Sequence, residues 1–323
     1  MIEAHRLGNG PIVHPGMCDS LGDNINGPSV VERPDWAPGP GRLMLYFAHH
    51  KGQHIRLAFA ERPTGPWQIC RPGVLPLADT PLALTRPDTP QPAWARGQNT
   101  DGLYPHLASP DVWIDDDARH FRMLFHGLAE HGEQVSYQAS SPDGLHWKVD
   151  GPPIAETYLR RFICRDKTYA MARLGILMRE TPEGWETGAQ AIPGSPRHVA
   201  VLVRGEVLSV FFTRIGDMPE RLMHAALDLS PPWPDWQAGS ETELLRPELD
   251  WEGAREPLRP SSVGAVDFAH ELRDPEVFEF EGKTYLVYSG AGEAALGIAE
   301  LRGLRSGRQH LAPAQRRREG KGM

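Results

Sequence analysis

The chain has 323 residues, of which 40% are hydrophobic and 24% charged, so it can bury a large core and has the composition of a globular protein. Its formal net charge of −8 argues against nucleic acid as the main partner, because binding to phosphates needs a basic face. No run of about 18 apolar residues occurs, and we therefore expect no membrane contact.

The N-terminal residues and the cysteines indicate a cellular compartment. The first ten residues, MIEAHRLGNG, contain no apolar segment of the kind found in signal peptides. The cysteines, Cys18, Cys70 and Cys164, are odd in number, far apart and without a Cys-x-x-Cys spacing, which fits a reducing compartment. We therefore expect a cytoplasmic protein.

One pattern recurs five times along the chain: short β-rich runs separated by turns, closed in the first four units by a tryptophan. In chain order the units are 28–67, 110–147, 160–185, 198–236 and 273–301. A full unit of about 40 residues is the length of a four-stranded propeller blade. The sequence thus predicts an all-β fold, a five-bladed β-propeller of four-stranded antiparallel blades around a central axial pocket. A β-sandwich is the alternative, but it would not repeat a tryptophan after each third strand.

Two long connections and the C-terminus fall outside the repeated units. Residues 68–109 form a proline-rich insertion between the first two blades, for which a lid over the pocket is one expected role. Residues 233–266 form a second connection, rich in acidic residues and proline. We expect a single propeller domain over residues 1–301, followed by a solvated basic tail, residues 302–323.

The segment SPDGLHW, from Ser141 to Trp147, is similar to an Asp-box turn. Asp143 and Gly144 are residue types that favour a tight turn, and Trp147 follows where it can pack between blades. We interpret this turn, and the tryptophans that close the blades, as structural.

The innermost strands of a propeller line its axis. Residues where these strands begin, and where the second strands end, therefore face one open end of the channel. These positions are polar in all five units, which predicts a binding pocket with carbohydrate as the partner, because arginine and histidine bind hydroxyls and sugar carboxylates. The predicted substrate-binding residues are Asn26, His49, His50, His106, His126, Arg161, Arg173, His198, Arg214, Glu271 and Arg273.

Three carboxylates of the same pocket are the predicted catalytic residues, namely Asp111, Asp274 and Glu293. They can act as acid or base if burial and neighbours separate their pKa values. Arg273, next to Asp274 in the chain, should favour the ionised form of that aspartate. An ion pair that only fixes the start of the strand is the alternative reading of Asp274.

No cofactor and no metal site is predicted, because the histidines lack a chelating spacing. Imidazole suits several divalent ions, so a cation in the axial channel held by His49, His126 or His198 is an alternative that stays open.

Several motifs resemble those of the five-bladed glycosidase superfamily that contains glycoside hydrolase families 43, 32, 68 and 117. They are GPSVV at 27–31, LMLYFAHH at 43–50, SPDVW at 109–113 and RDPEVFEFEGKTYLVYS at 273–289. The likeness covers most of the chain from Asn24 to Leu301 and looks most like uncharacterised relatives of family 43. It implies the five-bladed fold and the hydrolysis of a glycosidic bond by general acid/base catalysis.

The chain departs from family 43 at one important position. Enzymes of that family use an aspartate base in an Asp-Pro motif of the first blade, and the matching residue here is Gly27, before Pro28. In family 117 a histidine serves as the acid, a route that His49, His126 and His198 would make available.

Three functions stay open at this point. The first is a glycoside hydrolase that acts on an oligosaccharide or glycoside in the axial pocket. The second is a non-catalytic carbohydrate-binding propeller, which Gly27 favours. The third is a scaffold that uses the rim of the propeller for protein contacts. The sequence gives neither the sugar nor the oligomeric state.

Overall fold

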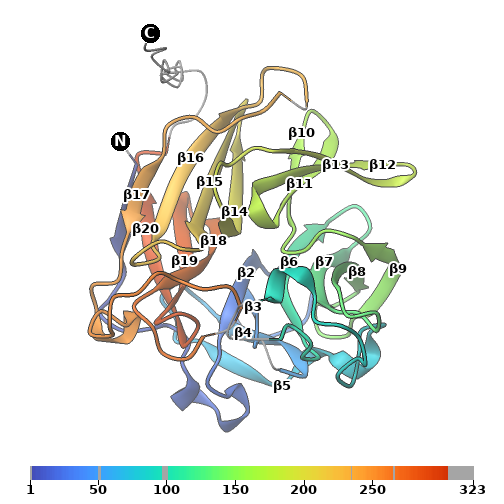
Figure 1. The fold of residues 1–323 in the computed structure, drawn as a ribbon, viewed down its shortest axis with the longest axis horizontal. Coiled ribbons are helices and arrows are strands. Elements are labelled where there is room, and N and C mark those ends of the chain that lie inside the picture. The colour runs from blue at the N-terminus through green and yellow to red at the C-terminus, as the bar shows by residue number, and fades with distance from the viewer. Residues whose placement is uncertain (1, 50–51, 97–100, 234, 265, 305–323) are drawn as a thin grey trace.

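The computed structural model describes residues 2–49, 52–96, 101–233, 235–264 and 266–304, which form five antiparallel sheets around a central axis (Figure 1). Each sheet has four strands, so the chain is a five-bladed β-propeller, and the prediction from the repeated units is confirmed. No helix within the described ranges is long and apolar enough to cross a membrane.

In the first four blades the strands follow one another from the axis to the rim in chain order. The first blade has β2 (Asn26–Glu32), β3 (Leu43–Ala48), β4 (His54–Ala60) and β5 (Gln68–Pro76). The second has β6 (Leu107–Asp115), β7 (His120–Leu128), β8 (Gln134–Ser141) and β9 (Lys148–Ile154). The third has β10 (Arg160–Cys164), β11 (Lys167–Ala172), β12 (Ile176–Thr181) and β13 (Gly184–Gln190). The fourth has β14 (Pro196–Arg204), β15 (Val207–Arg214), β16 (Leu222–Asp228) and β17 (Thr242–Leu245).

The fifth blade is built from both ends of the chain. Its inner strands are β18 (Leu272–Phe280), β19 (Lys283–Gly290) and β20 (Ala295–Arg302), and its rim strand is the N-terminal β1 (Glu3–Arg6). β1 pairs antiparallel with β20, with Glu3 opposite Arg302. The backbone hydrogen bonds of this pair close the ring and cover the edge that β20 would otherwise expose.

The segment expected as an insertion, residues 68–109, begins with a strand of the first blade. β5 pairs with β4, so the true connection is shorter and starts at Leu77. The described parts of the connections contain six short 3-10 helices: η1 (Pro15–Met17), η2 (Asp19–Leu21), η3 (Leu77–Asp79), η4 (Ala93–Ala95), η5 (Arg173–Gly175) and η6 (Asp250–Glu252). Residues 305–323, most of the expected basic tail, lie outside the described residues.

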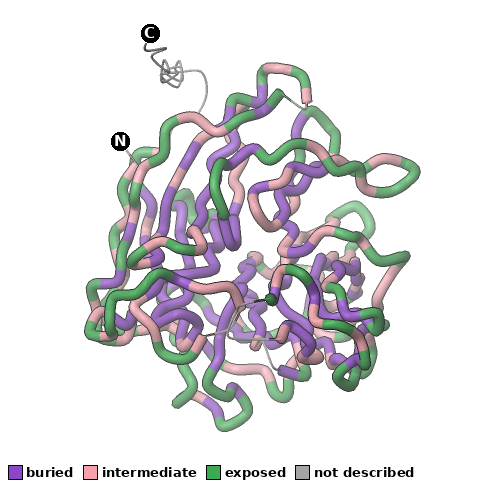
Figure 2. The backbone as a smooth tube through the Cα atoms, in the orientation of Figure 1, coloured by how far each residue is buried: buried purple, intermediate pink, exposed green. Residues whose placement is uncertain are grey.

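The core lies between neighbouring blades, where buried strands face one another (Figure 2). Two of the tryptophans that close the blades belong fully to this core, since Trp67 is 4% exposed and Trp236 is 2% exposed, whereas Trp185 is only partly buried. Trp147 packs against the same cluster as Tyr46, with ring centroids 5.8 Å apart. The structural interpretation of these tryptophans is confirmed.

The Asp-box turn forms as its sequence predicts. The Asp143 carboxylate accepts hydrogen bonds from the backbone N–H groups of Leu145 and His146 at 2.8 and 2.9 Å. The Tyr46 hydroxyl donates a hydrogen bond of 2.9 Å to the carbonyl of Gly144, across to the first blade. This turn therefore joins two blades and has no contact with the axis.

Four of the five inner strands have a β-bulge near their starts, which positions the site, whereas β10 pairs in continuous register. The pairing of β2, β6, β14 and β18 with the next strand shifts register at this point. The bulges in three of these strands contain Gly27, Ser109 and Asp274, each followed by proline and each in the left-handed region, with φ of 54°, 51° and 47°. Proline has no backbone N–H to donate to the neighbouring strand. It is tolerated at a bulge because a residue there does not take part in the regular hydrogen bonding of the sheet. Such bulges redirect side chains, here toward the axis.

The residue after each of these bulges bonds the backbone of the next blade. Ser29 Oγ accepts from Val112 N–H, Asp111 Oδ2 from Arg161 N–H, and Glu276 Oε1 from Val30 N–H, while Arg160 Nε donates to the carbonyl of Val199. These contacts form a layer of side chains that ties neighbouring blades together around the axis.

Candidate active site

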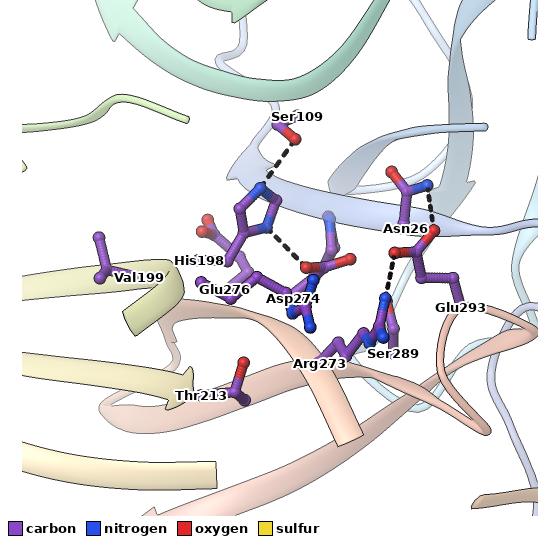
Figure 3. Close-up of polar contacts among 12 residues, drawn as sticks. Asn26, Ser109, His198, Val199, Thr213, Arg273, Asp274, Glu276, Ser289 and Glu293 are labelled. Carbon is purple, nitrogen blue, oxygen red and sulfur yellow. Dashed lines mark hydrogen bonds and ion pairs between the residues drawn. The ribbon is translucent and has the colours of Figure 1, made fainter. Parts of the chain in front are cut away.

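Three polar side chains from three different blades are connected in a line at the propeller axis (Figure 3). Ser109 Oγ lies 2.9 Å from His198 Nε2, and His198 Nδ1 lies 2.8 Å from Asp274 Oδ1. Ser109, His198 and Asp274 are 3%, 2% and 2% exposed. Each nitrogen of the imidazole thus contacts a different oxygen, one from a hydroxyl and one from a carboxylate.

Tyr158 covers this line of contacts. It precedes β10 and has a φ of 59°, so the third blade also places a left-handed residue at the start of its inner strand. Its ring centroid lies 4.2 Å from that of His198 and 4.1 Å from that of His126. Burial raises the pKa of Tyr158 to about 12, so its hydroxyl keeps its proton at neutral pH.

A buried network of charges lies beside the line, centred on Arg273, which is fully buried. Its guanidinium donates to Glu271 at 2.7 Å and to Glu293 at 3.0 Å. Burial alone would lower the pKa of Arg273, but the carboxylates of Glu220, Glu271 and Glu293 outweigh it and raise that pKa. The guanidinium therefore stays charged, and it holds these acidic groups close to Asp274.

Two amides complete the environment of Glu293. Asn24 and Asn26 donate to Glu293 Oε2 at 2.7 and 3.2 Å, so this carboxylate connects the first blade to the fifth. On the other side of the network, Arg197 makes a bidentate pair with Glu220 at 2.7 and 2.8 Å. These buried charges are paired and hydrogen-bonded, as burial of charge requires.

A hollow opens above Tyr158, and residues of three blades and of both long connections line it. The lining residues are Trp94, Tyr104, Gln134, Tyr158, Arg173, Arg197, Ile215, Val263 and Gly264. Trp94 comes from the connection for which we expected a lid, and the Arg173 guanidinium lies 5.7 Å from the centroid of its ring. Aromatic faces and arginines thus meet directly over the axis.

Most of the predicted pocket residues come together at the axis or line the hollow. At the axis are Asn26, His106, His126, His198, Glu271, Arg273, Asp274 and Glu293, all of them buried. Arg173 lines the hollow. His106 and His126 belong to the second blade and lie against each other, with ring centroids 5.7 Å apart.

Three of the other predicted residues, Arg161, Arg214 and His49, have contacts of a different kind. Arg161 stacks on the ring of Trp113, with the guanidinium 4.6 Å from its centroid. Arg214 donates to the carbonyl of Pro193 at 3.2 Å. His49 lies 3.5 Å from Asp23. His50 lies outside the described residues.

Asp111, a predicted catalytic residue, belongs to the layer that joins the blades. Its carboxylate accepts from Arg161 N–H at 2.8 Å and contacts the Arg160 guanidinium at 3.4 Å. Burial raises the pKa of Asp111, and the charge of Arg160 acts in the opposite direction. Its contacts are those of a group that ties the second blade to the third.

The sequence did not predict three residues of this site, namely Ser109, Tyr158 and Arg197. One signal could have found Ser109: the Ser-Pro pair at 109–110 matches the Gly-Pro pair at 27–28 and the Asp-Pro pair at 274–275. Tyr158 and Arg197 are not followed by proline, so they carry no such signal. Within the described ranges, no group of three or more His, Cys, Asp or Glu side chains comes together so as to hold a metal ion.

Comparison with known proteins identifies a relative and confirms the fold. The chain is 30% identical over 308 residues to the uncharacterized protein R118 of Acanthamoeba polyphaga mimivirus, covering 86% of this chain and 83% of that protein. The chain belongs to the family of R118. No protein-family model matches this member of the R118 family.

Comparison with solved structures identifies known proteins that share the fold of this chain. A family 43 β-xylosidase/α-arabinofuranosidase from a compost microbial metagenome matches with a TM-score of 0.59 and 11% identity, over 92% of this chain and 94% of the enzyme. A glycoside hydrolase structure from Parabacteroides distasonis gives a TM-score of 0.59 and 12% identity, over 93% and 96% of the two chains. A family 43 enzyme from Xanthomonas citri gives 0.56 and 13%, over 90% and 88%. The fold is therefore that of the five-bladed glycoside hydrolases of family 43, as the motifs implied.

Proposed function

We propose that the protein binds a carbohydrate in the hollow at the propeller axis and hydrolyses a glycosidic bond there by general acid/base catalysis. The observation that carries this proposal is a hollow lined by aromatic rings and arginines next to a buried polar network that contains two carboxyls, Asp274 and Glu293. Two of the enzymes that share the fold have been determined with xylotriose bound, which supports a carbohydrate as ligand.

The lining of the hollow favours a sugar that carries a carboxylate. Trp94, Tyr104 and Tyr158 are the aromatic side chains of the described lining, and Arg173 and Arg197 are its charged groups, with no acidic side chain among them. Arg197 is already paired with Glu220, so Arg173 is the group available to an anion. Arginine binds carboxylates in a bidentate manner, and we therefore expect a uronic acid residue to bind more tightly than its neutral counterpart.

Asp274 and Glu293 are the carboxyls that we assign to catalysis. Glycosidases of this chemical type need one acid to protonate the leaving oxygen and a second carboxyl to activate water or attack the sugar. Both carboxyls act on Arg273: Glu293 pairs with its guanidinium at 3.0 Å, and the charge of Asp274 also raises the pKa of that arginine. His198, in contact with Asp274, adds an imidazole that can transfer a proton.

The test is a panel of aryl glycosides and oligosaccharides, neutral and uronic, with wild type, Asp274→Asn and Glu293→Gln. We expect both substitutions to lower kcat by at least about 100-fold, the range typical for loss of acid/base catalysis. Asp117→Asn is the matched control, because Asp117 is exposed in the turn between β6 and β7. Sugar release that Asp274→Asn leaves unchanged would remove Asp274 from the mechanism.

A non-catalytic carbohydrate-binding propeller is the second candidate, favoured by Gly27 at the first-blade position where family 43 has its base. It predicts that uronic oligosaccharides bind saturably to wild type in calorimetry, that Arg173→Gln weakens this binding, and that no product forms over long incubation. Product formation that depends on Asp274 or Glu293 would exclude it.

A further inference from the structure

The contacts of His198 have the order found in nucleophilic hydrolases. Ser109 Oγ lies 2.9 Å from Nε2, and Asp274 Oδ1 lies 2.8 Å from Nδ1 of the same imidazole. We infer that Ser109 is the nucleophile of a Ser–His–Asp triad that hydrolyses an ester, an activity separate from glycosidic cleavage. Such triads are recognised by geometry and not by chain order, and here the residues come from the second, fourth and fifth blades.

The two contacts assign distinct roles to the nitrogens of His198. Asp274 Oδ1 lies 2.8 Å from Nδ1, outside the alignment of a hydrogen bond, and the negative charge of its carboxylate favours the tautomer that carries the proton on Nδ1. The lone pair of Nε2 then faces the Ser109 hydroxyl and can accept its proton. Asp274 is a positioning residue that also stabilises the imidazolium, whereas Ser109 and His198 handle the reacting atoms.

The backbone at Ser109 is strained, although the residue itself is buried. Ser109 is a non-glycine residue with a φ of 51°, at the start of an inner strand. Left-handed conformations of this kind are retained where the surrounding structure enforces them, and they cluster at active sites. Asp274, with a φ of 47°, has the same conformation on the fifth blade.

Gly27 leaves the space that Ser109 occupies. A Cβ atom at position 27 would lie 2.9 Å from Ser109 Cα and 3.2 Å from Ser109 Oγ. A side chain at this point of the first blade is therefore incompatible with the serine in its present place. The absence of a first-blade carboxylate and the presence of the triad have the same structural origin.

The chemistry balances with water as the only co-reactant. Ser109 Oγ attacks the ester carbonyl carbon while its proton moves to His198 Nε2, and the alcohol leaves with that proton as the C–O bond breaks. Water then attacks the acyl-serine, gives one proton to His198, and releases the carboxylic acid as Ser109 recovers its proton. Pro110 follows Ser109 and has no N–H, so we assign the donor to the oxyanion to the hydroxyl of Tyr158, whose ring packs against His198.

An O-acylated sugar is the substrate class that this arrangement fits. Tyr158 contacts His198 and also lines the hollow, so a sugar bound in the hollow would be separated from the triad by this one side chain. The sugar part of this substrate rests on the proposed function, whereas the triad itself does not.

The test is covalent labelling of the full chain with a fluorophosphonate, together with hydrolysis of p-nitrophenyl acetate. We expect a mass adduct on the peptide that contains Ser109, and at least a 100-fold loss of both rates in Ser109→Ala and Ser109→Gly. Glycine suits a left-handed residue, so the second variant remains informative if alanine prevents folding. Ser289→Ala is the matched control, since Ser289 is equally buried but bonds only the carbonyl of Ile25.

Labelling that is absent, falls on another residue or persists in the Ser109 variants would overturn the triad. Asp274→Asn should slow labelling by at least 100-fold and change its pH profile, which a merely structural aspartate would not do. Glycoside cleavage is measured on the same wild-type preparation. Glycoside cleavage without labelling of Ser109 would refute the triad and leave the proposed function intact. Labelling of Ser109 without glycoside cleavage would support the triad and refute the proposed hydrolysis of a glycosidic bond.

Discussion

The guanidinium of Arg160 donates a hydrogen bond of 2.9 Å to the carbonyl of Pro28, so a side chain of the third blade bonds the backbone of the first. The same guanidinium bonds the carbonyl of Pro110 in the second blade at 2.8 Å and that of Val199 in the fourth at 3.2 Å. One buried arginine thus joins four blades at the axis.

Replacing Arg160 with alanine should destabilise the propeller strongly. It removes the cation that faces Asp111 at 3.4 Å and Glu276 at 3.6 Å, and leaves both carboxyls buried. Breaking a buried pair in this way costs about 3–5 kcal/mol. Urea unfolding at pH 7 measures the loss, and Arg62→Ala, on an exposed turn, is expected to change stability by less than about 0.5 kcal/mol. Equal stability of the two variants would show that Arg160 does not hold the blades together.

Glu276 should make the stability of the protein fall as the pH rises. Burial raises the pKa of this glutamate to about 7, from an ordinary value of 4.5, against the opposing charge of Arg160. Between these two values the folded state binds more protons than the unfolded state, so the free energy of unfolding decreases with pH. Glu276→Gln cannot ionise, and it should gain roughly 2–3 kcal/mol relative to wild type between pH 4.5 and pH 8. Parallel stability curves for the two proteins, measured by urea unfolding, would contradict the raised pKa.

A side chain at Gly27 should destabilise the protein without creating a glycosidase base. Gly27 has a φ of 54°, and an added Cβ would lie 2.9 Å from Ser109 Cα. Gly151→Ala separates the cost of the left-handed backbone from the cost of the steric clash. Gly151 has a φ of 72°, but nothing lies within 4 Å of the added Cβ atom. We expect Gly151→Ala to lose about 1–2 kcal/mol and both Gly27→Ala and Gly27→Asp to lose more. Increased cleavage of aryl glycosides by Gly27→Asp would show that the first-blade position can still accept a base.

The Asp-box turn should contribute stability that depends on the charge of Asp143. Partial burial acts in the opposite direction, but hydrogen bonds from His146, Leu145 and Ser141 lower the pKa of Asp143 to about 2. The stabilisation is therefore complete above the ordinary value near 3.8 and is lost as the pH falls through 2. Asp143→Ala should lose about 1–3 kcal/mol at pH 7 and less at pH 3, in urea unfolding at both pH values. A loss that is the same at both would mean that the charge has no part in it.

The amino-acid sequence alone determined the features that depend on neighbours along the chain. Alternating apolar runs and closing tryptophans such as Trp67 and Trp236 predicted the blades, because each blade is a meander of consecutive strands. The Asp-box turn was equally local, since Asp143 bonds residues two and three positions further on. The N-terminal strand in the fifth blade was not predicted, because its partner β20 lies at the other end of the chain.

Only the tertiary structure decided which polar side chains meet. The sequence predicted Arg161 for the pocket, but Arg160 reaches the axis and Arg161 stacks on Trp113. Neighbouring residues of a strand face opposite sides, and the sequence does not give the register of β10 against β11, so the strand pattern cannot decide which of the two arginines faces inward. Ser109, His198 and Asp274 lie on three separate blades, and closure of the ring brings them to one point that no spacing in the sequence encodes.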